Sequence, residues 1–255
     1  MQHYPKPIRD LIRSLSKLPG VGEKTAERLA IHILRNSLNE AEALPETLRH
    51  VAREARAHGD CETIAVDGGS GDDSVAVVAA HPWVRVLSAT RGRAAQMNAG
   101  AAAATGDVLL FLHADTTLPP GALAAIAAAA RAPGFAYGGF RHRFSGADWR
   151  LRAISALHNF RCRHARTFSG DQALFVGRTA FAAVGGFSLQ QVEDIALCQR
   201  LRALAPPAFL PLAVTTSSRK FERMGIWRSF GRVLAILVCL RLGRKPPQAF
   251  FADIR

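Results

Sequence analysis

Acidic residues stand at three places where they could bind a charged or hydroxyl-bearing ligand. Asp67 follows an apolar run and precedes Gly68 and Gly69, whose lack of side chains lets a ligand approach the backbone. Asp115 ends the apolar run VLLFLHAD, and Glu193-Asp194 begins the stretch EDIALCQRL. Carboxylate oxygens accept hydrogen bonds and bind divalent cations. These acids are therefore the first candidates for a functional site.

The segments around these acids predict alternating strands and helices. TIAVD and VLLFLHAD have the apolar character of buried parallel strands, and RGRAAQMNAGAAAATGD between them favours a helix. LPPGALAAIAAAARA is also helical, with Pro119 and Pro120 at its start. This order predicts an α/β fold with a doubly wound, mainly parallel sheet flanked by helices. Ligands bind such sheets at the carboxyl ends of the strands, where Asp67 and Asp115 lie.

The composition limits the class of protein. A chain of 255 residues can form one large α/β domain or two small ones, and a formal net charge of +13 suits nucleic acid, a nucleotide-sugar or a membrane surface. The four cysteines form no CxxC pair, which indicates reduced thiols and a cytoplasmic protein. The N-terminus lacks a signal-peptide pattern, and the apolar run at 233–240 is shorter than the roughly 20 residues of a membrane span.

Residues 18–30, LPGVGEKTAERLA, predict a helix-hairpin-helix. Gly20 and Gly22 let the turn pass close to another backbone, and the free N–H groups of the next helix favour a phosphate, with Lys24 beside them. The segment 1–36 resembles the N-terminus of the recombination-repair family RecR, which implies sequence-independent contact with a DNA backbone. The alternative is a tight turn between two helices with no ligand.

The resemblance to RecR stops after this segment. That family should continue into a four-cysteine zinc motif and a Toprim domain, but no cysteine precedes Cys61 and the acidic Toprim cluster has no counterpart. One hairpin touches only a few phosphates, so we expect weak, salt-sensitive nucleic-acid binding at most.

Residues 37–255 contain six motifs that resemble, in this order, the family 2 glycosyltransferases with the GT-A fold. The motifs are SLNEAEALPETL, VDGGSGDDS, GRAAQMNAGAAAATGDVLLFLHADT, GDQALFVGR, VGGF and EDIALCQRL. Within this family, the sequence resembles a subgroup with HAD in place of the usual DxD, whose members are often labelled arsenosugar-biosynthesis glycosyltransferases. The resemblance implies transfer of a sugar, of the hexosyltransferase type, from a nucleotide-diphosphate sugar to an unknown acceptor hydroxyl with inversion.

The resemblance also implies roles for individual residues. The donor would be bound by Asn39, Glu40, Asp67, Gly68, Gly69, Arg93, Gln96, Asn98 and Asp115. Asp171, Gln172 and Glu193 would form the acceptor side, and Asp194 would be the base that takes the acceptor proton. The alternatives are structural: Asp67 as a turn or N-cap residue, Arg93 as a solvated charge, and Glu193-Asp194 as caps favoured by the helix dipole.

Asp115 and His113 are the candidate ligands of a divalent cation, Mn²⁺ or Mg²⁺, bridging the diphosphate. His113 stands where the family usually has an aspartate, and histidine tolerates Mn²⁺ better than Mg²⁺. A packed or hydrogen-bonded histidine that binds no metal is the alternative.

The structure of the junction between the two segments decides whether the chain is an active transferase or an inactive fusion. The family's first central strand should stand just before LNE, where this chain has AIHILRNS. Backbone groups left unpaired in a central slot cost about 1–3 kcal/mol each, whereas unwinding a helix forfeits about 0.7 kcal/mol or less per residue. We therefore predict that residues 31–35 form a strand beside 64–66, and that the transferase interpretation outweighs DNA binding.

The C-terminal segment SSRKFERMGIWRSFGRVLAILVCLRLGRK combines arginines, aromatic residues and an apolar run. One interpretation is a helix lying on an anionic membrane, which would place the protein peripherally at the inner membrane face. The other is a core-packing helix with a solvated basic face.

Overall fold

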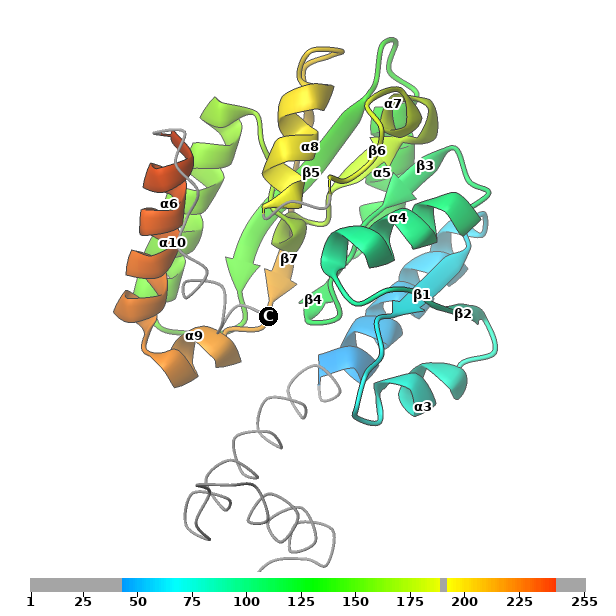
Figure 1. The fold of residues 1–255 in the computed structure, drawn as a ribbon, viewed down its shortest axis with the longest axis horizontal. Helices are drawn as coiled ribbons and strands as arrows, with labels where there is room; N and C mark the ends of the chain where they lie inside the picture. Colours follow the sequence, from blue (N-terminus) through cyan, green and yellow to red (C-terminus); the bar gives the residue numbers. More distant parts are fainter. Residues whose placement is uncertain (1–42, 189–191, 242–255) are drawn as a thin grey trace, which may run out of the picture.

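The computed structural model describes residues 43–188 and 192–241 (Figure 1). Along the chain, the elements are a helix at 43–58, β1 (Thr63–Asp67), α3 (Ser74–Ala79), β2 (Val84–Ser88), α4 (Arg93–Ala103), β3 (Val108–Leu110), β4 (Thr116–Thr117), α5 (Ala122–Ala130), β5 (Tyr137–Phe144), α6 (Trp149–Ala165), the 3-10 helix η1 (Gly170–Gln172), β6 (Phe175–Gly177), α7 (Arg178–Ala183), α8 (Glu193–Leu201), β7 (Ala208–Thr216), α9 (Arg219–Met224) and α10 (Ile226–Arg241).

The described strands form two sheets. β1 and β2 are parallel, and a five-stranded sheet has the order β3-β6-β5-β7-β4. In the larger sheet β5 and β7 are parallel, whereas β6 is antiparallel to both β3 and β5, and β4 is antiparallel to β7. The α/β alternation predicted from the sequence is confirmed, and the short strands β4 and β6 add antiparallel pairings to it.

The helices next to the acidic residues lie where the sequence predicts them, but the strand before Asp115 is shorter than expected. β3 ends at Leu110, and its pairing with β6 is antiparallel rather than parallel. The backbone N–H of Thr116 donates to the carbonyl of His113 at 3.1 Å. His113 and Asp115 therefore lie in a turn between β3 and β4, which frees their side chains from the alternation of a strand.

The helix at 43–58 connects the two sheets. Leu48 packs against Val78 and Val84 beside the β1–β2 pair. On the other side, the Thr47 hydroxyl donates to the carbonyl of Ala114 at 2.7 Å. This helix therefore holds the β1–β2 pair beside the turn that carries Asp115.

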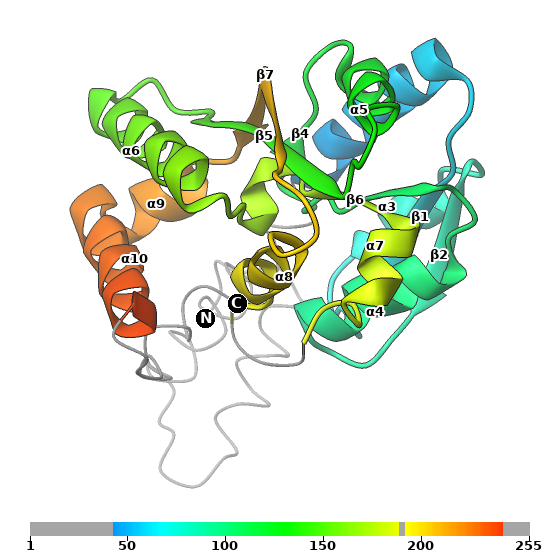
Figure 2. The same ribbon diagram turned by 90° about the horizontal axis from the view of Figure 1, so that it is seen from above.

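Helices α6 and α10 lie side by side beyond the end of the larger sheet, and α9 leads into α10 (Figure 2). Leu151 and Ile154 of α6 and Ile226 of α10 form one apolar cluster with Phe144 of β5. Within the described ranges, no helix has both the length and the apolar composition needed to cross a membrane.

Several sequence predictions lie outside the described residues. These are the hairpin residues Gly20, Gly22 and Lys24, the donor residues Asn39 and Glu40, and the strand predicted at 31–35. Within 43–188 and 192–241, β2 is the only strand paired with β1.

Candidate active site

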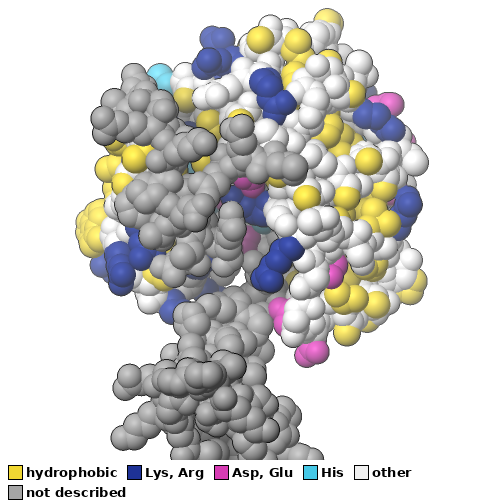
Figure 3. All heavy atoms as spheres, viewed as in Figure 1, with side chains coloured by type: hydrophobic (Ala, Val, Ile, Leu, Met, Phe, Trp, Pro, Cys, Tyr) yellow, Lys and Arg dark blue, Asp and Glu magenta, His cyan; other side chains and the backbone are white. Residues whose placement is uncertain are grey.

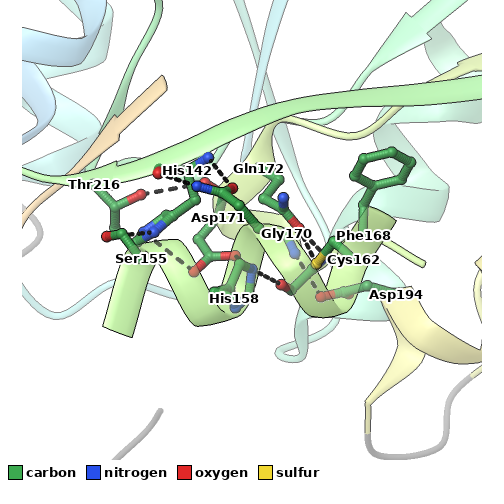
Figure 4. Close-up of polar contacts among 12 residues, drawn as sticks. His142, Ser155, His158, Cys162, Phe168, Gly170, Asp171, Gln172, Asp194 and Thr216 are labelled. Atoms are coloured by element: carbon green, nitrogen blue, oxygen red, sulfur yellow. Dashed lines mark hydrogen bonds and ion pairs between the residues drawn. The ribbon is translucent and has the colours of Figure 1, made fainter. Parts of the chain in front are cut away.

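Asp194 lies at the start of α8 and is aimed at η1 (Figure 4). Its carboxylate Oδ2 accepts a hydrogen bond from the backbone N–H of Gly170 at 2.7 Å. The side chain is buried, and Oδ1 has no hydrogen-bond partner in the described part of the chain. A buried carboxylate oxygen without a donor is costly, so it points to a ligand that would supply one.

His113 meets Asp194 across Gly170. A Cβ atom built on Gly170 would lie 2.2 Å from His113 Nε2 and 3.3 Å from Asp194 Oδ2. Only glycine lets the histidine ring and the carboxylate approach this backbone together. Like Asp194 Oδ1, the buried Nε2 of His113 lacks a hydrogen-bond partner among the described residues.

Asp171 lies between two histidines from other elements. Its Oδ2 is 3.6 Å from Nε2 of His142 on β5, and its Oδ1 is 3.8 Å from Nε2 of His158 on α6. Burial alone would raise the pKa of Asp171, but the two imidazoles and the Ser169 hydroxyl hold that pKa well below its usual range. Burial lowers the pKa of His158 to about 4, against the opposing effect of Asp171.

The Gln172 side chain holds η1 in place through three hydrogen bonds. Its Nε2 donates to the carbonyl of Phe140 at 3.1 Å, and its Oε1 accepts from Ser169 N–H at 3.2 Å and from the Cys162 thiol at 2.9 Å. Gln172 is fully buried, and Figure 4 shows its contacts with the neighbouring elements. Both the nitrogen and the oxygen of the amide therefore bond within the protein, which favours a supporting role for Gln172.

Two backbone outliers flank these residues. Ala173, directly after η1, has φ 48°, and Val192, directly before α8, has φ 64°. A β-branched residue rarely adopts the left-handed region, because its side chain clashes with the backbone there. Strain of this kind is concentrated at functional sites, and here it adjoins both Asp171 and Asp194.

The donor-side residues on α4 connect to two neighbouring elements. Arg93 Nε lies 2.8 Å from Oε1 of the buried Glu193, which joins the first residue of α4 to the first residue of α8. Asn98 exchanges two hydrogen bonds of 2.9 Å with the backbone of Phe187. Arg93 and Glu193, predicted on the donor and acceptor sides, are thus in contact, and Asn98 holds the loop between α7 and α8.

Asp67 ends β1 as predicted, and its carboxylate accepts hydrogen bonds from the N–H groups of Gly69 at 2.9 Å and Ser70 at 3.0 Å. The Ser70 hydroxyl, together with these two N–H groups, lowers the pKa of Asp67 against the opposing effect of burial. Gln96 Nε2 donates to the carbonyl of Val66 at 2.9 Å, and its side chain covers Gly68, where a Cβ would approach to 2.8 Å. The end of β1 and the helix α4 are therefore locked together.

Asp115 lies in the turn between β3 and β4 of the larger sheet. Its backbone carbonyl accepts from Ser217 N–H at 3.0 Å, while its carboxylate accepts only a long bond, 3.3 Å, from the Thr116 hydroxyl among the contacts described. Figure 3 shows acidic and basic side chains together in a recess at the centre of the face viewed. The half-buried carboxylate retains acceptor capacity for a cation or a ligand.

The sequence reasoning missed His142 and His158. His142 lies on β5 between Phe140 and Phe144 at a spacing of two, so its place in the strand puts it on the buried face. His158 follows Leu151 and Ile154 along the inward face of α6. The signal in the sequence that could have identified both residues was a histidine at a position where the pattern of the strand or helix predicts a buried side chain.

Comparison with known proteins matches two parts of the chain. The model of the family described as glycosyl transferase family 2 matches residues 36–195, and that described as RecR, helix-hairpin-helix, matches residues 8–52. The recombination protein RecR of Desulfatibacillum aliphaticivorans is 49% identical over 65 residues, covering 26% of this chain and 33% of the relative. The RecR of Desulforapulum autotrophicum is 59% identical over 44 residues, covering 17% and 22%.

Solved structures share the fold of the larger part. The mannosyltransferase PcManGT from Pyrobaculum calidifontis, in complex with GDP-Man and Mn²⁺, has a TM-score of 0.58 at 19% identity and covers 85% of this chain and 65% of its own. Glucosyl-3-phosphoglycerate synthase from Mycobacterium tuberculosis, with Mn²⁺, UDP and glucosyl-3-phosphoglycerate, has a TM-score of 0.55 at 19% identity, covering 80% and 78%. S. aureus TarS in complex with UDP-GlcNAc has a TM-score of 0.56 at 15% identity, covering 71% and 56%.

These matches confirm the predicted GT-A architecture and both predicted resemblances. The chain spans about a third of the RecR protein it matches and 65% of the mannosyltransferase, so neither likeness extends over a whole relative. The family 2 model, in contrast, covers more than half of this chain, from residue 36 to residue 195, which includes the acidic pair that begins α8. The chain belongs to glycosyl transferase family 2.

Proposed function

We propose that this protein transfers a sugar from a nucleotide-diphosphate donor to an acceptor hydroxyl, with inversion at the anomeric carbon and with Asp194 as the general base. The observation that carries the proposal is the carboxylate of Asp194, which is buried, oriented by the Gly170 N–H and left with one unpartnered oxygen. Family membership supports the reaction class, and the burial and hydrogen bonding of Asp194 support its proposed role as the base.

Asp194 can act as a base because its two oxygens have separate tasks. Oδ2 is fixed by Gly170, so Oδ1 is free to accept the proton of an acceptor hydroxyl. The acceptor oxygen then forms a bond to the anomeric carbon, the bond from that carbon to the diphosphate breaks, and its electron pair leaves with the diphosphate. The strained backbone at Val192 and the contact between Arg93 and Glu193 hold the start of α8 in position.

The donor side is the cluster at the carboxyl end of β1 and the start of α4. Gly69 leaves the backbone open next to Asp67, whereas Gly68 is covered by the Gln96 side chain. The guanidinium of Arg93 is half-exposed beside α8, where it can meet a negative charge. The similar structures were solved with GDP-Man, UDP-GlcNAc or UDP, which supports a nucleotide at this end of the sheet.

His113 and Asp115 fit a divalent cation. The unpartnered, buried Nε2 of His113 is a suitable nitrogen ligand for Mn²⁺, and the Asp115 carboxylate supplies oxygen. In the part of the chain that the structure describes, no three His, Cys, Asp or Glu side chains gather to hold a metal ion. The remaining ligands would come from the diphosphate and water, and the cation would stabilise the charge of the leaving group. Two of the similar structures contain Mn²⁺.

Asp171 is the candidate acceptor-side residue. It belongs to η1, whose Gly170 contacts Asp194, and the two flanking histidines keep its carboxylate charged. A charged carboxylate within the same loop can accept a hydrogen bond from a second hydroxyl of a polyhydroxylated acceptor. Asp171 would then orient the acceptor while Asp194 deprotonates it.

A thermal-shift panel tests the donor assignment. UDP-, GDP- and dTDP-sugars are added with and without Mn²⁺, and we expect one nucleotide to raise the melting temperature more in the presence of Mn²⁺, because a ligand of the folded state stabilises it. Hydrolysis of that donor is then measured with Mn²⁺. If no nucleotide-sugar shifts the melting temperature, the transferase proposal is wrong.

A second function is supported by the match of residues 8–52 to the RecR helix-hairpin-helix. We propose weak, sequence-independent DNA binding through Gly20, Gly22 and Lys24. Retention of labelled duplex DNA should be weak even at low salt, because few phosphates are contacted, and it should be lost at moderate salt and decrease in Lys24→Ala, because the contacts are electrostatic. A tight, salt-insensitive complex would contradict this proposal without affecting the first.

A further inference from the structure

Two helices present large apolar side chains to solvent. Trp149, Leu157 and Phe160 of α6 are 68%, 50% and 62% exposed. Trp227, Leu234 and Val238 of α10 are 54%, 48% and 49% exposed. The spacing of these residues places each set of three on one side of its helix. We call the six residues the tryptophan face.

The tryptophan face is continuous across the two helices. The rings of Trp149 and Trp227 have centroids 6.4 Å apart, and α6 and α10 lie side by side in Figures 1 and 2. The opposite sides of these helices pack into the apolar cluster around Phe144. Packing within the fold therefore explains the apolar residues on the inner sides of α6 and α10. It does not explain the apolar residues on their outer side.

The charges on the same helices are of one sign. Together α6 and α10 contain seven arginines and no aspartate or glutamate. Arg152 is exposed and stands three residues after Trp149, so it borders the face, and Arg228 follows Trp227 directly. Asp148, the acid closest in sequence to α6, is bound by Arg150.

The combination of exposed apolar side chains and arginines indicates which kind of partner the tryptophan face would bind. A second copy of the chain would bring arginine against arginine, which disfavours association. Nucleic acid would pair with the arginines but would give Leu157, Leu234 and Val238 no apolar environment. The surface of an anionic bilayer satisfies both features, because tryptophan rings sit at the headgroup level, aliphatic side chains reach the acyl boundary and arginines meet lipid phosphates.

We propose that the tryptophan face docks this protein peripherally onto an anionic lipid bilayer, with Trp149 and Trp227 inserted at the headgroup level. The helices would lie along the membrane plane, in agreement with the finding that no described helix can cross it. In Figure 3, hydrophobic and basic atoms lie together at the left edge of the molecule, the side on which Figure 1 shows α6 and α10.

Vesicle flotation with the full chain tests the proposal. We expect binding to vesicles of phosphatidylcholine with about a third phosphatidylglycerol, much weaker binding to phosphatidylcholine alone, and release by salt, which screens the charges. The double variant Trp149→Ala/Trp227→Ala should lower the bound fraction about tenfold. Trp83→Ala, the matched control, removes the remaining tryptophan of the chain, which is 38% exposed before β2, and should bind like the parent.

A pair of charge-reversal variants tests the proposal even if the tryptophan variants fold poorly. Arg152→Glu should weaken flotation, whereas Arg131→Glu makes the same charge change on an exposed residue at the end of α5 and should not. Equal binding to both vesicle types, or unchanged binding of the double variant and Arg152→Glu, would overturn the proposal. A dimer in light scattering that the tryptophan variants dissociate would show that a second copy covers the face, which would also overturn it.

Discussion

The two sheets differ in how deeply they bury their side chains. In the five-stranded sheet, Phe140, Phe175 and Val176 are fully buried, and His142 of β5 is buried as well. In the β1–β2 pair, β2 buries Val84 but leaves Val86 38% exposed. The larger sheet thus positions the candidate catalytic acids by dense packing, while the smaller pair positions the donor-side residues largely by hydrogen bonds from Gln96 and around Asp67.

This difference has a consequence for function. A general base must keep a fixed geometry and a dry environment, and close-packed surroundings provide both. A nucleotide must enter and leave, and a less deeply buried edge allows this at smaller cost. Changes in the larger sheet and its loops should therefore have larger effects than equivalent changes around β1 and β2.

The largest effect is expected for Asp194→Asn. The amide can still accept the Gly170 hydrogen bond, but it cannot take the acceptor proton, so turnover should fall by about 10²–10⁴-fold while donor binding remains. Steady-state kinetics and nucleotide titration measure the two quantities. Asp148→Asn, at the half-buried N-cap of α6, is the control and should leave turnover unchanged, because asparagine can also cap the helix. Near parental turnover of Asp194→Asn would refute the base assignment.

A matched pair of valines tests the packing difference directly. Val176→Ala in β6 removes two methyl groups from a fully buried site and should lower the free energy of unfolding by about 2–3 kcal/mol. Val86→Ala in β2 removes the same groups from an exposed site and should change it by less than about 0.5 kcal/mol. Urea unfolding measures both, and equal losses would contradict the comparison.

His158, on the helix α6 that packs against β5, should make the protein sensitive to acid. Its pKa in the folded protein is about 4, below the value of about 6.5 for an unfolded chain, so the unfolded state binds more protons between these values. The free energy of unfolding should therefore fall as the pH falls from about 6.5 to about 4, by about 2 kcal/mol more than in His158→Gln. Urea unfolding at pH 4 to 8 measures the difference, and parallel pH profiles would disprove it.

The smallest effect is expected for Asp115→Ala, in the turn between β3 and β4. Loss of one cation ligand should weaken donor binding about tenfold, which is about 1.4 kcal/mol, and remove its dependence on Mn²⁺. Isothermal titration with and without Mn²⁺ measures this. Asp72→Ala is the control, because the Asp72 carboxylate already accepts from Ser74 N–H. Unaltered nucleotide and Mn²⁺ affinity in Asp115→Ala would exclude the metal role.

Sequence patterns predicted the elements that depend on local residues. The strand ending at Asp67, the helix after Arg93 and the helix beginning at Glu193 are all present. The extent of β3 could not be read from VLLFLHAD, because an apolar run does not show where its pairing partner ends. Here β6 is only three residues long, so pairing stops at Leu110 and the chain turns at His113.

The candidate site was predicted less completely than the fold. Its acids could be found because each stands next to an element boundary or in a recognisable motif. The contact of Gly170 with both His113 and Asp194, and the enclosure of Asp171 by His142 and His158, join segments far apart in the chain. The roles of Asn39 and Glu40 and the strand at 31–35 stay predictions, since they lie outside the described residues.

The sequence by itself determined the family, the alternation of strands and helices, and which carboxylates could do chemistry, because periodicity, caps and motifs are local properties of the chain. The tertiary structure alone decided which of these groups meet. It buried Asp194 and left one of its oxygens unpartnered, and it aligned Trp149 with Trp227 on neighbouring helices. Burial and long-range contact depend on how elements pack, and packing is set by the whole chain at once rather than by any single segment of it.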